Sequence, residues 1–298
     1  MVLPAAAQEP QTPVFRGGVA AVKVDVQVTS RGRAVPDLTA ADFRVYDDGQ
    51  PQKIAYFGHE SDPLDLVLLL DVSGSMSRSL QELAAAARSA LGALHEGDRV
   101  AVMLFAREST LREPFTADFA EVQNEIRDAV REHGLGSGTA IYAAIIKAAG
   151  YLGEQGSAKA RRAVLIVTDN LSLNYQVTEQ DVLRALYSAD AVLNSILIGR
   201  QKRPDPVKPG QYVNPDFIPS DVFKLADQTG GEAEEARKAG ESFEQMIGRI
   251  RARYGLQYDA PPSAPGAFHR ICVELSPEAL KRYPQAVVRA RAGYYAAR

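Results

Sequence analysis

Hydrophobic residues alternate with polar ones near the start of the chain, where every second residue from 22 to 28 is valine. This period of two predicts a half-buried β-strand, because successive side chains of a strand point to opposite faces of a sheet. Residues 30–33 predict a turn, and residues 42–46 predict a second strand that enters a tight hairpin turn at 47–49. We expect residues 53–57 to form the return strand of this antiparallel β segment.

From residue 63 onward the pattern changes to continuous apolar runs separated by stretches of helical periodicity. Residues 64–71, 162–169 and 191–198 predict strands that helices cover on both faces. The other predicted elements are strands at 99–105 and 111–115 and helices at 79–95, 118–132, 140–152, 178–188, 220–229 and 241–253. This alternation predicts the α/β class, with a doubly wound, mostly parallel sheet.

Period two returns after residue 253, with strands expected at 254–259, 268–275 and 286–295. The simplest architecture joins both β segments in one small antiparallel β-sandwich, into which the α/β domain is inserted. The alternative is two separate β flanks. The predicted divisions are a disordered leader at 1–13, a first sandwich part at 14–62, the α/β domain at 63–253 and a second sandwich part at 254–298.

Composition and charge narrow the function classes. The 298 residues are 46% hydrophobic and carry a formal net charge of −3, so we expect no nucleic-acid partner. No apolar run has the length of a transmembrane helix, so we expect no integral membrane segment. Cys272 is the single cysteine, which excludes an intrachain disulfide, and its apolar neighbours predict a buried side chain.

The leader contains Ala5-x-Ala7, which fits the small-residue rule of a secretory cleavage site, although no apolar segment precedes it. We therefore predict an extracytoplasmic location, periplasmic or secreted. The alternative is a leader without a targeting role.

Oxygen-bearing side chains follow two of the predicted buried strands. Asp71, Ser73 and Ser75 come directly after the first strand, and Asp169 ends another. Thr139 follows a glycine-rich turn at the start of a predicted helix. Ligands of doubly wound sheets bind beyond the carboxyl ends of the strands, so these three segments should meet at one edge.

Such a set of oxygens suits Mg²⁺, which takes octahedral oxygen ligands and keeps several waters. Two carboxylates and three hydroxyls leave an open position, which an Asp or Glu of a partner protein could fill. Each residue also has an ordinary alternative role: Asp71 as a helix cap, the two serines as turn residues, Thr139 as the N-cap of the next helix, and Asp169 as a strand end. The ordinary roles do not require all five residues to lie at one sheet edge, so their expected convergence there favours the metal site.

With these residues the chain resembles a von Willebrand factor type A (VWA) domain over about residues 63–253. The Asp-x-Ser-x-Ser element is Asp71, Ser73 and Ser75, and Thr139 and Asp169 match the remaining positions of the metal-ion-dependent adhesion site (MIDAS). The resemblance implies a Rossmann-like fold and protein binding through Mg²⁺ or Mn²⁺ rather than Ca²⁺. Asn170 stands where family members often have glycine, and it also tolerates turn geometry.

The flanking segments are similar to bacterial VWFA-related proteins. The stretches that show this similarity are Ala41-Asp42-Phe43-Arg44-Val45-Tyr46-Asp47-Asp48-Gly49 and Arg291-Ala292-Gly293-Tyr294-Tyr295. Adhesion domains of this kind also shift their last helix on ligand binding, which here would be residues 241–253.

The functional hypothesis is a non-enzymatic, metal-dependent protein-binding module of the adhesion type. A structural or assembly subunit with a vestigial metal site and a metal-assisted hydrolase are the alternatives. Enzyme chemistry is disfavoured because Ser73 lacks a Gly-x-Ser-x-Gly context and the chain has no Walker-type lysine loop. The long proline-rich loop at 200–219, with Tyr212 and Phe217, and Tyr175 are candidate apolar contacts for a partner.

Overall fold

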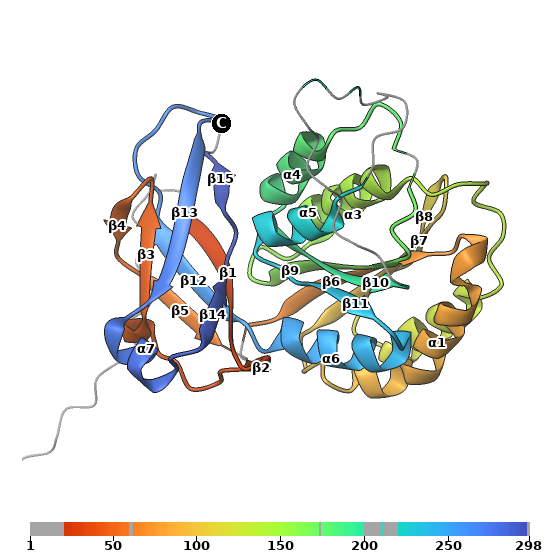
Figure 1. The fold of residues 1–298 in the computed structure, drawn as a ribbon, viewed down its shortest axis with the longest axis horizontal. Helices are drawn as coiled ribbons and strands as arrows, with labels where there is room; N and C mark the ends of the chain where they lie inside the picture. Colours follow the sequence, from red (N-terminus) through yellow and green to blue (C-terminus); the bar gives the residue numbers. More distant parts are fainter. Residues whose placement is uncertain are drawn as a thin grey trace, which may run out of the picture.

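The structure is a computed structural model that describes residues 21–59, 62–172, 174–199, 210, 212 and 220–296. It contains an antiparallel β-sandwich beside an α/β unit with helices on both faces of a central sheet (Figure 1). The predicted leader at 1–13 lies outside the described residues.

The central sheet has six strands in the order β11-β10-β9-β6-β7-β8. All neighbours are parallel except β7 and β8, which pair antiparallel at one edge. The predicted doubly wound, mostly parallel sheet is therefore confirmed. The strands are β6 (Leu64–Asp71), β7 (Arg99–Phe105), β8 (Ser109–Thr116), β9 (Arg161–Thr168), β10 (Ala191–Ile198) and β11 (Ala233–Ala236).

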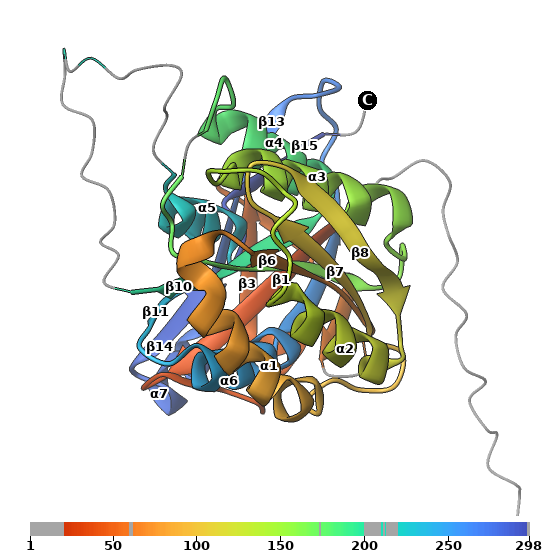
Figure 2. The same cartoon turned by 90° about the vertical axis from the view of Figure 1, so that its right-hand side faces the viewer.

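Two layers of helices explain why residues 66–70 of β6 are all apolar. Leu66, Leu68 and Leu70 pack with α1, α2 and α6, whereas Val67 and Leu69 pack with α3, α4 and α5 on the other face. Figure 2 shows α1, α2 and α6 below the sheet and α3, α4 and α5 above it. The bounds are α1 (Ser77–Leu91), α2 (Phe119–Ala129), α3 (Ile141–Gln155), α4 (Glu179–Ser188), α5 (Val222–Thr229) and α6 (Ala239–Arg251).

The β-sandwich has two antiparallel sheets around an apolar core to which the valines of β1 contribute. One sheet has the order β14-β1-β12-β5, with β2 paired to β1, and the other has the order β15-β13-β3-β4. The bounds are β1 (Ala21–Ser30), β2 (Arg33–Ala34), β3 (Phe43–Asp47), β4 (Gln50–Gln52), β5 (Tyr56–His59), β12 (Tyr254–Asp259), β13 (Phe268–Leu275), β14 (Ala286–Arg289) and β15 (Gly293–Tyr295).

Strands from both ends of the chain share each sheet of the sandwich. β12 pairs with β1 on one side and with β5 on the other, and β13 pairs with β3. The chain leaves the sandwich after β5, forms the α/β unit and returns at β12. The inserted arrangement is therefore correct, and the alternative of two separate β flanks is wrong.

Three sequence predictions within the sandwich are wrong. The return strand of the first hairpin is β4, and residues 53–55 are irregular, because Asp48 and Gly49 form a two-residue turn that fixes the pairing from Gln50. The predicted strand at 286–295 is two strands, β14 and β15, which belong to different sheets. Cys272 is exposed, because in β13 it is Ile271 that faces the core.

The sequence patterns also missed several short elements: the edge strand β11, the helix α7 (Pro277–Arg282), and the 3-10 turns at Ala40–Asp42 and Gly74–Met76. Such elements are too short for a periodic signal. Among the described residues, no helix combines the length and apolar character needed to cross a bilayer.

Arginines connect the sandwich to the α/β unit. The carboxylate of Asp25 on β1 forms ion pairs with two guanidinium groups. One belongs to Arg161 of β9, at 3.2 Å, and the other to Arg253, which follows α6. Arg253 also donates to the carbonyl of Gly230 at 2.6 Å. Because Arg161 further donates to the carbonyls of Ile250 and Arg251, the end of α6 is fixed to both units.

Candidate metal centre

Asp71 and Asp169 lie at the same edge of the central sheet. β6 and β9 are adjacent and parallel, with Leu70 opposite Val167, so both strands end at the same level. Asp71 is the last residue of β6, and Asp169 directly follows Thr168 at the end of β9. The predicted convergence of these two carboxylates is therefore observed.

The two serine hydroxyls lie between the carboxylates. Ser75 Oγ donates to Asp169 Oδ2 at 2.6 Å, and Ser73 Oγ lies 3.3 Å from Ser75 Oγ. The turn at Gly74–Met76 begins immediately after Ser73 and leads into α1, which brings both hydroxyls back over the strand end. Ser75 is exposed, so this side of the cluster is open to solvent.

Asp71 is fully buried, and both of its carboxylate oxygens accept hydrogen bonds. Oδ1 accepts from the backbone N–H of Ser73 at 2.9 Å, and Oδ2 accepts from the Thr168 hydroxyl at 2.6 Å. Burial raises the pKa of Asp71 and the nearby charge of Asp169 adds to this, while the hydrogen bonds from Thr168 and Ser73 oppose it. A cation at this edge would favour the charged form of Asp71.

The backbone next to Thr139 reaches the same edge, although among the described residues no hydrogen bond joins the Thr139 side chain to the two aspartates or the two serines. The N–H of Ala140 donates to the carbonyl of Ala106 at 2.8 Å, one residue beyond Phe105, which is the register partner of Asp71. The alternative role of Thr139 as the N-cap of α3 is wrong. Ala140 holds the N-cap position, and no side chain makes a capping hydrogen bond there. The buried side chain of Thr139 is therefore not used as a cap.

The loop after β9 is shaped by two asparagines. Asn170 has a φ of 58°, the left-handed conformation that its position after the second aspartate was expected to tolerate. Asn174 Oδ1 accepts from the N–H of Tyr142 at 2.9 Å, in the first turn of α3. This bond ties the loop that follows Asp169 to the helix that follows Thr139.

The donor set fits a small divalent cation. It consists only of carboxylate and hydroxyl oxygens, which are the ligands that Mg²⁺ prefers. Asp71, whose oxygens both accept hydrogen bonds, suits contact through water, whereas Ser73 and Ser75 are positioned for direct contact. Asp169 Oδ2 accepts a hydrogen bond from the Ser75 hydroxyl, so these two oxygens lie side by side at 2.6 Å.

Thr168 belongs to this site and was not among the predicted residues. Its hydroxyl donates to Asp71 and also accepts from the N–H of Asn170 at 3.1 Å. The available signal was a hydroxyl residue at the end of a buried strand, directly before Asp169. The sequence alone gives no reason to separate it from the other β-branched residues of that strand.

Exposed apolar side chains lie on loops at residues that the sequence offered as partner contacts and at Leu171. Leu171 and Tyr175, on the loop after Asp169, expose 61% and 62% of their surfaces, and Tyr212 exposes 81%. Tyr175 and Tyr212 are thus accessible, as contact residues must be. Phe217 and most of the predicted loop at 200–219 lie outside the described residues.

Residues 66–171 match the von Willebrand factor type A domain family. The match includes Asp71, Ser73, Ser75, Thr139 and Asp169. This segment of the chain is therefore a VWA domain. VWA domains are typically protein-binding modules, are mostly non-catalytic and commonly bind a divalent cation at the MIDAS. No curated protein matches the sequence.

Several solved structures are similar in fold. An aerotolerance-related membrane protein from Bacteroides fragilis is 17% identical, with a TM-score of 0.47, over 63% of this chain and 98% of that chain. The conserved hypothetical protein BatB from Bacteroides thetaiotaomicron is 16% identical, with a TM-score of 0.41, over the same shares. A von Willebrand factor type A protein from Catenulispora acidiphila is 14% identical, with a TM-score of 0.47, over 95% of this chain and 75% of that chain.

Proposed function

We propose that this protein is a non-enzymatic, metal-dependent binding module that captures an acidic side chain of a partner protein. The observation that carries the proposal is the convergence of Asp71, Ser73, Ser75 and Asp169 within hydrogen-bond distances at one sheet edge. Thr139 completes the proposed MIDAS from the neighbouring loop. Mg²⁺ or Mn²⁺ is the proposed cation, because the donors are all oxygens.

The geometry suggests how the site would act. Asp71 is buried and supplies negative charge from below, while the exposed Ser75 faces the solvent. Hydroxyl ligands are neutral, and carboxylates that act through water neutralise the cation only in part. The cation therefore presents positive charge at its solvent-exposed side. An Asp or Glu of the partner would fill the vacant position, and the exposed Leu171 and Tyr175 would contact apolar side chains beside it.

A hydrolytic role has less support. In the described part of the chain, the hydroxyls of Ser73 and Ser75 bond to each other and to Asp169, and no histidine takes part in these bonds. A serine nucleophile needs an adjacent general base. A structural or assembly subunit with a vestigial metal site remains the second candidate, and metal binding separates it from the first.

Calorimetric titration with Mg²⁺ tests the proposal directly. The wild-type chain should bind one equivalent, and Asp71→Asn, which nearly preserves the side-chain volume, should abolish measurable binding. Asp259→Asn, which changes an exposed aspartate at the end of β12, is the matched control and should bind as wild type does. Absence of Mg²⁺ and Mn²⁺ binding to the wild-type chain would favour the vestigial site.

Partner capture provides the second test. A pull-down from the native envelope fraction should recover a partner in Mg²⁺, lose it in chelator and fail with Asp71→Asn. If the partner is recovered equally with chelator and with Asp71→Asn, the metal-dependent mechanism is contradicted. The same fraction tests the proposed extracytoplasmic location, since a chain found only in the cytoplasmic fraction would contradict it.

We further propose that the binding domain extends over 63–253 and that its last helix transmits ligand binding to the sandwich. α1 starts just after Ser75 and packs against α6, where the N–H of Ala239 donates to Glu82 of α1 at 3.0 Å. The end of α6 leads directly into β12. Hydrogen exchange of α6 should change when metal and partner bind, and identical protection would refute the coupling.

A further inference from the structure

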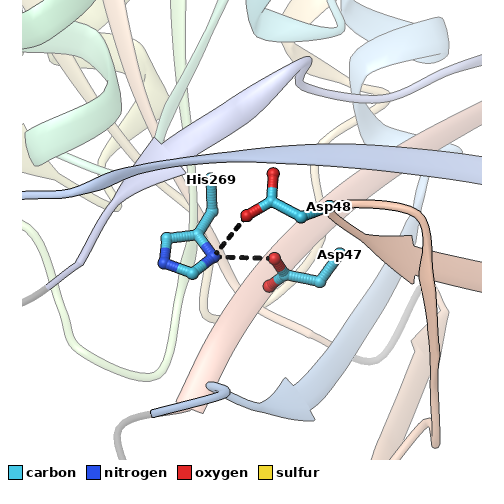
Figure 3. A group of neighbouring side chains, drawn as sticks. All are labelled: Asp47, Asp48 and His269. Carbon is cyan, nitrogen blue, oxygen red and sulfur yellow. Dashed lines mark hydrogen bonds and ion pairs between the residues drawn. The ribbon is translucent and has the colours of Figure 1, made fainter. Parts of the chain in front are cut away.

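A second cluster of metal-ligating side chains lies in the β-sandwich, outside the metal edge of the VWA domain. Asp47 ends β3, Asp48 begins the following turn, and His269 lies on the neighbouring strand β13 (Figure 3). His269 Nδ1 lies 2.8 Å from Asp47 Oδ1 and 3.2 Å from Asp48 Oδ2. One ring nitrogen thus faces two carboxylate oxygens at the same time.

The hairpin holds the two aspartates in this arrangement. Asp48 has a φ of 47° and Gly49 a φ of 79°, the left-handed pair of a two-residue turn that joins β3 to β4. The N–H of Asp48 donates to the carbonyl of Arg270 at 2.8 Å, and the N–H of Arg270 donates to Asp48 Oδ1 at 3.0 Å. Only the second oxygen of Asp48 is therefore left to face His269.

Asp47 is positioned in the same way from the core side. Its Oδ2 accepts hydrogen bonds from the hydroxyls of Tyr258 at 2.8 Å and Tyr294 at 2.9 Å. Its Oδ1 faces His269, whose ring stacks on Tyr294 with a centroid distance of 5.0 Å. Outer partners that fix the far oxygen of a carboxylate and the plane of an imidazole are characteristic of metal ligands.

In the described part of the chain, no lysine or arginine side chain forms an ion pair with Asp47 or Asp48. The nearby Arg291 lies over the Tyr294 ring, 5.7 Å from its centroid, and pairs with Asp190. The single Nδ1 of His269 faces both carboxylates, one of them nearly fully buried. Two close carboxylates repel each other, and a divalent cation between them would neutralise both.

We propose that Asp47, Asp48 and His269 form a second cation site, which takes Zn²⁺. An imidazole nitrogen with two carboxylates suits a borderline transition metal, whereas Mg²⁺ and Ca²⁺ take oxygen ligands. Zn²⁺ bonds of about 2.0–2.2 Å place neighbouring ligands about 3.3 Å apart. The 3.2 Å between His269 Nδ1 and Asp48 Oδ2 already matches this spacing, whereas the imidazole of His269 and the carboxylate of Asp47, now 2.8 Å apart, must separate by about 0.5 Å when the ion binds.

The proposed ion would join the first and second parts of the sandwich. Asp47 and Asp48 precede the α/β insertion, and His269 follows it, so one ion would bond segments 222 residues apart. Three protein ligands leave a fourth position, which water fills from the exposed side of Asp48. The site stabilises the β module and is chemically distinct from the oxygen-only metal edge.

Zinc titration of the full chain, without a histidine tag and after chelator treatment, tests the site. Calorimetry in the Asp71→Asn background removes the contribution of the first metal edge. We expect one equivalent of Zn²⁺ to bind and to raise the unfolding temperature, while Mg²⁺ at the same concentration does neither. Absence of Zn²⁺ binding in this background would overturn the proposal.

Substitutions locate the bound ion. Asp48→Asn keeps the bond from the Arg270 N–H and removes one charged ligand, so Zn²⁺ should bind at least about tenfold more weakly. Asp259→Asn, an exposed aspartate of the same sandwich, should leave the affinity unchanged. Unchanged affinity in Asp48→Asn would show that the three side chains form only a hydrogen-bond network.

A spectroscopic measurement separates lost ligation from lost folding. Co²⁺ in the site should give the visible absorption of a low-symmetry complex with a nitrogen ligand, and His269→Gln should remove it. Unfolding curves of the metal-free variants show whether each one is folded. A folded His269→Gln chain that retains the Co²⁺ spectrum would overturn the assignment.

Discussion

Ser75 Oγ lies 2.6 Å from Asp169 Oδ2, although 94 residues separate the two in the chain. This bond joins the turn after β6 to the end of β9 and closes the proposed metal site. Ser75→Ala should therefore lower the affinity for Mg²⁺ at least about tenfold, with little effect on the fold because Ser75 is exposed. Calorimetry measures the affinity. Ser77→Ala, which removes only a local bond to the Gly74 carbonyl, should bind normally.

Thr168 is a positioning residue for Asp71. Thr168→Val keeps the side-chain shape but leaves Asp71 Oδ2 without its donor in a buried position. The free energy of unfolding without metal should fall by about 1–3 kcal/mol, and the Mg²⁺ affinity should fall about 10–100-fold. Urea unfolding and calorimetry measure the two effects. Thr110→Val, on the edge strand β8, is the control, and equal losses in both variants would contradict the role of Thr168.

Arg253 is buried at the junction of the sandwich and the VWA domain. Arg253→Met removes its bonds to Asp25 and to the Gly230 carbonyl, while Asp25 keeps its pair with Arg161. Breaking the buried pair of Arg253 and Asp25 should lower the free energy of unfolding by about 3 kcal/mol. Denaturant unfolding checks this value. The exposed Arg237→Met should change stability only slightly, and a similarly small effect at Arg253 would show that the junction does not depend on it.

Two glycines should respond oppositely to alanine. A Cβ at Gly231 would lie 1.8 Å from the carbonyl oxygen of Leu193, so Gly231→Ala should cost at least about 3 kcal/mol. Gly150 is exposed within α3, and a Cβ there meets nothing within 4 Å. Gly150→Ala should therefore stabilise the chain by about 0.5–1 kcal/mol. Thermal unfolding distinguishes the two, and a stabilised Gly231→Ala would contradict the close approach.

Asp42 should contribute an acid-dependent part of the stability. Burial raises the pKa of Asp42, but hydrogen bonds from Thr39 and the guanidinium of Arg282 outweigh burial and hold it below its usual range. The folded pKa thus lies below the unfolded value of about 3.9, so this contribution is present above pH 4 and is lost as pH falls through the folded pKa. Asp42→Asn should lower stability at pH 7 by about 1 kcal/mol and flatten the acid side of the profile. Unfolding curves between pH 2 and 7 measure this, and parallel profiles would refute it.

Much of the α/β unit could be predicted from the sequence because its strands are covered on both faces. A strand such as β10 must then be mostly apolar, and its predicted bounds, 191–198, are those observed. The Thr178 and Asp181 pair likewise marks the start of α4 through a capping box. In the sandwich, alternation with period two instead predicted β1, β12 and β13, whose alternate residues face one core.

The sequence by itself determined the local elements and the oxygen donors of the proposed first metal site, because periodicity and side-chain type can be read residue by residue. Only the tertiary structure decided which distant segments meet: Thr168 on Asp71, the split of residues 286–295 between two sheets, and Asp47 and Asp48 beside His269. The physical reason is that cross-strand contacts depend on register and sheet order. Their free energy comes from burial and hydrogen bonding between segments far apart in the chain, which no local pattern records.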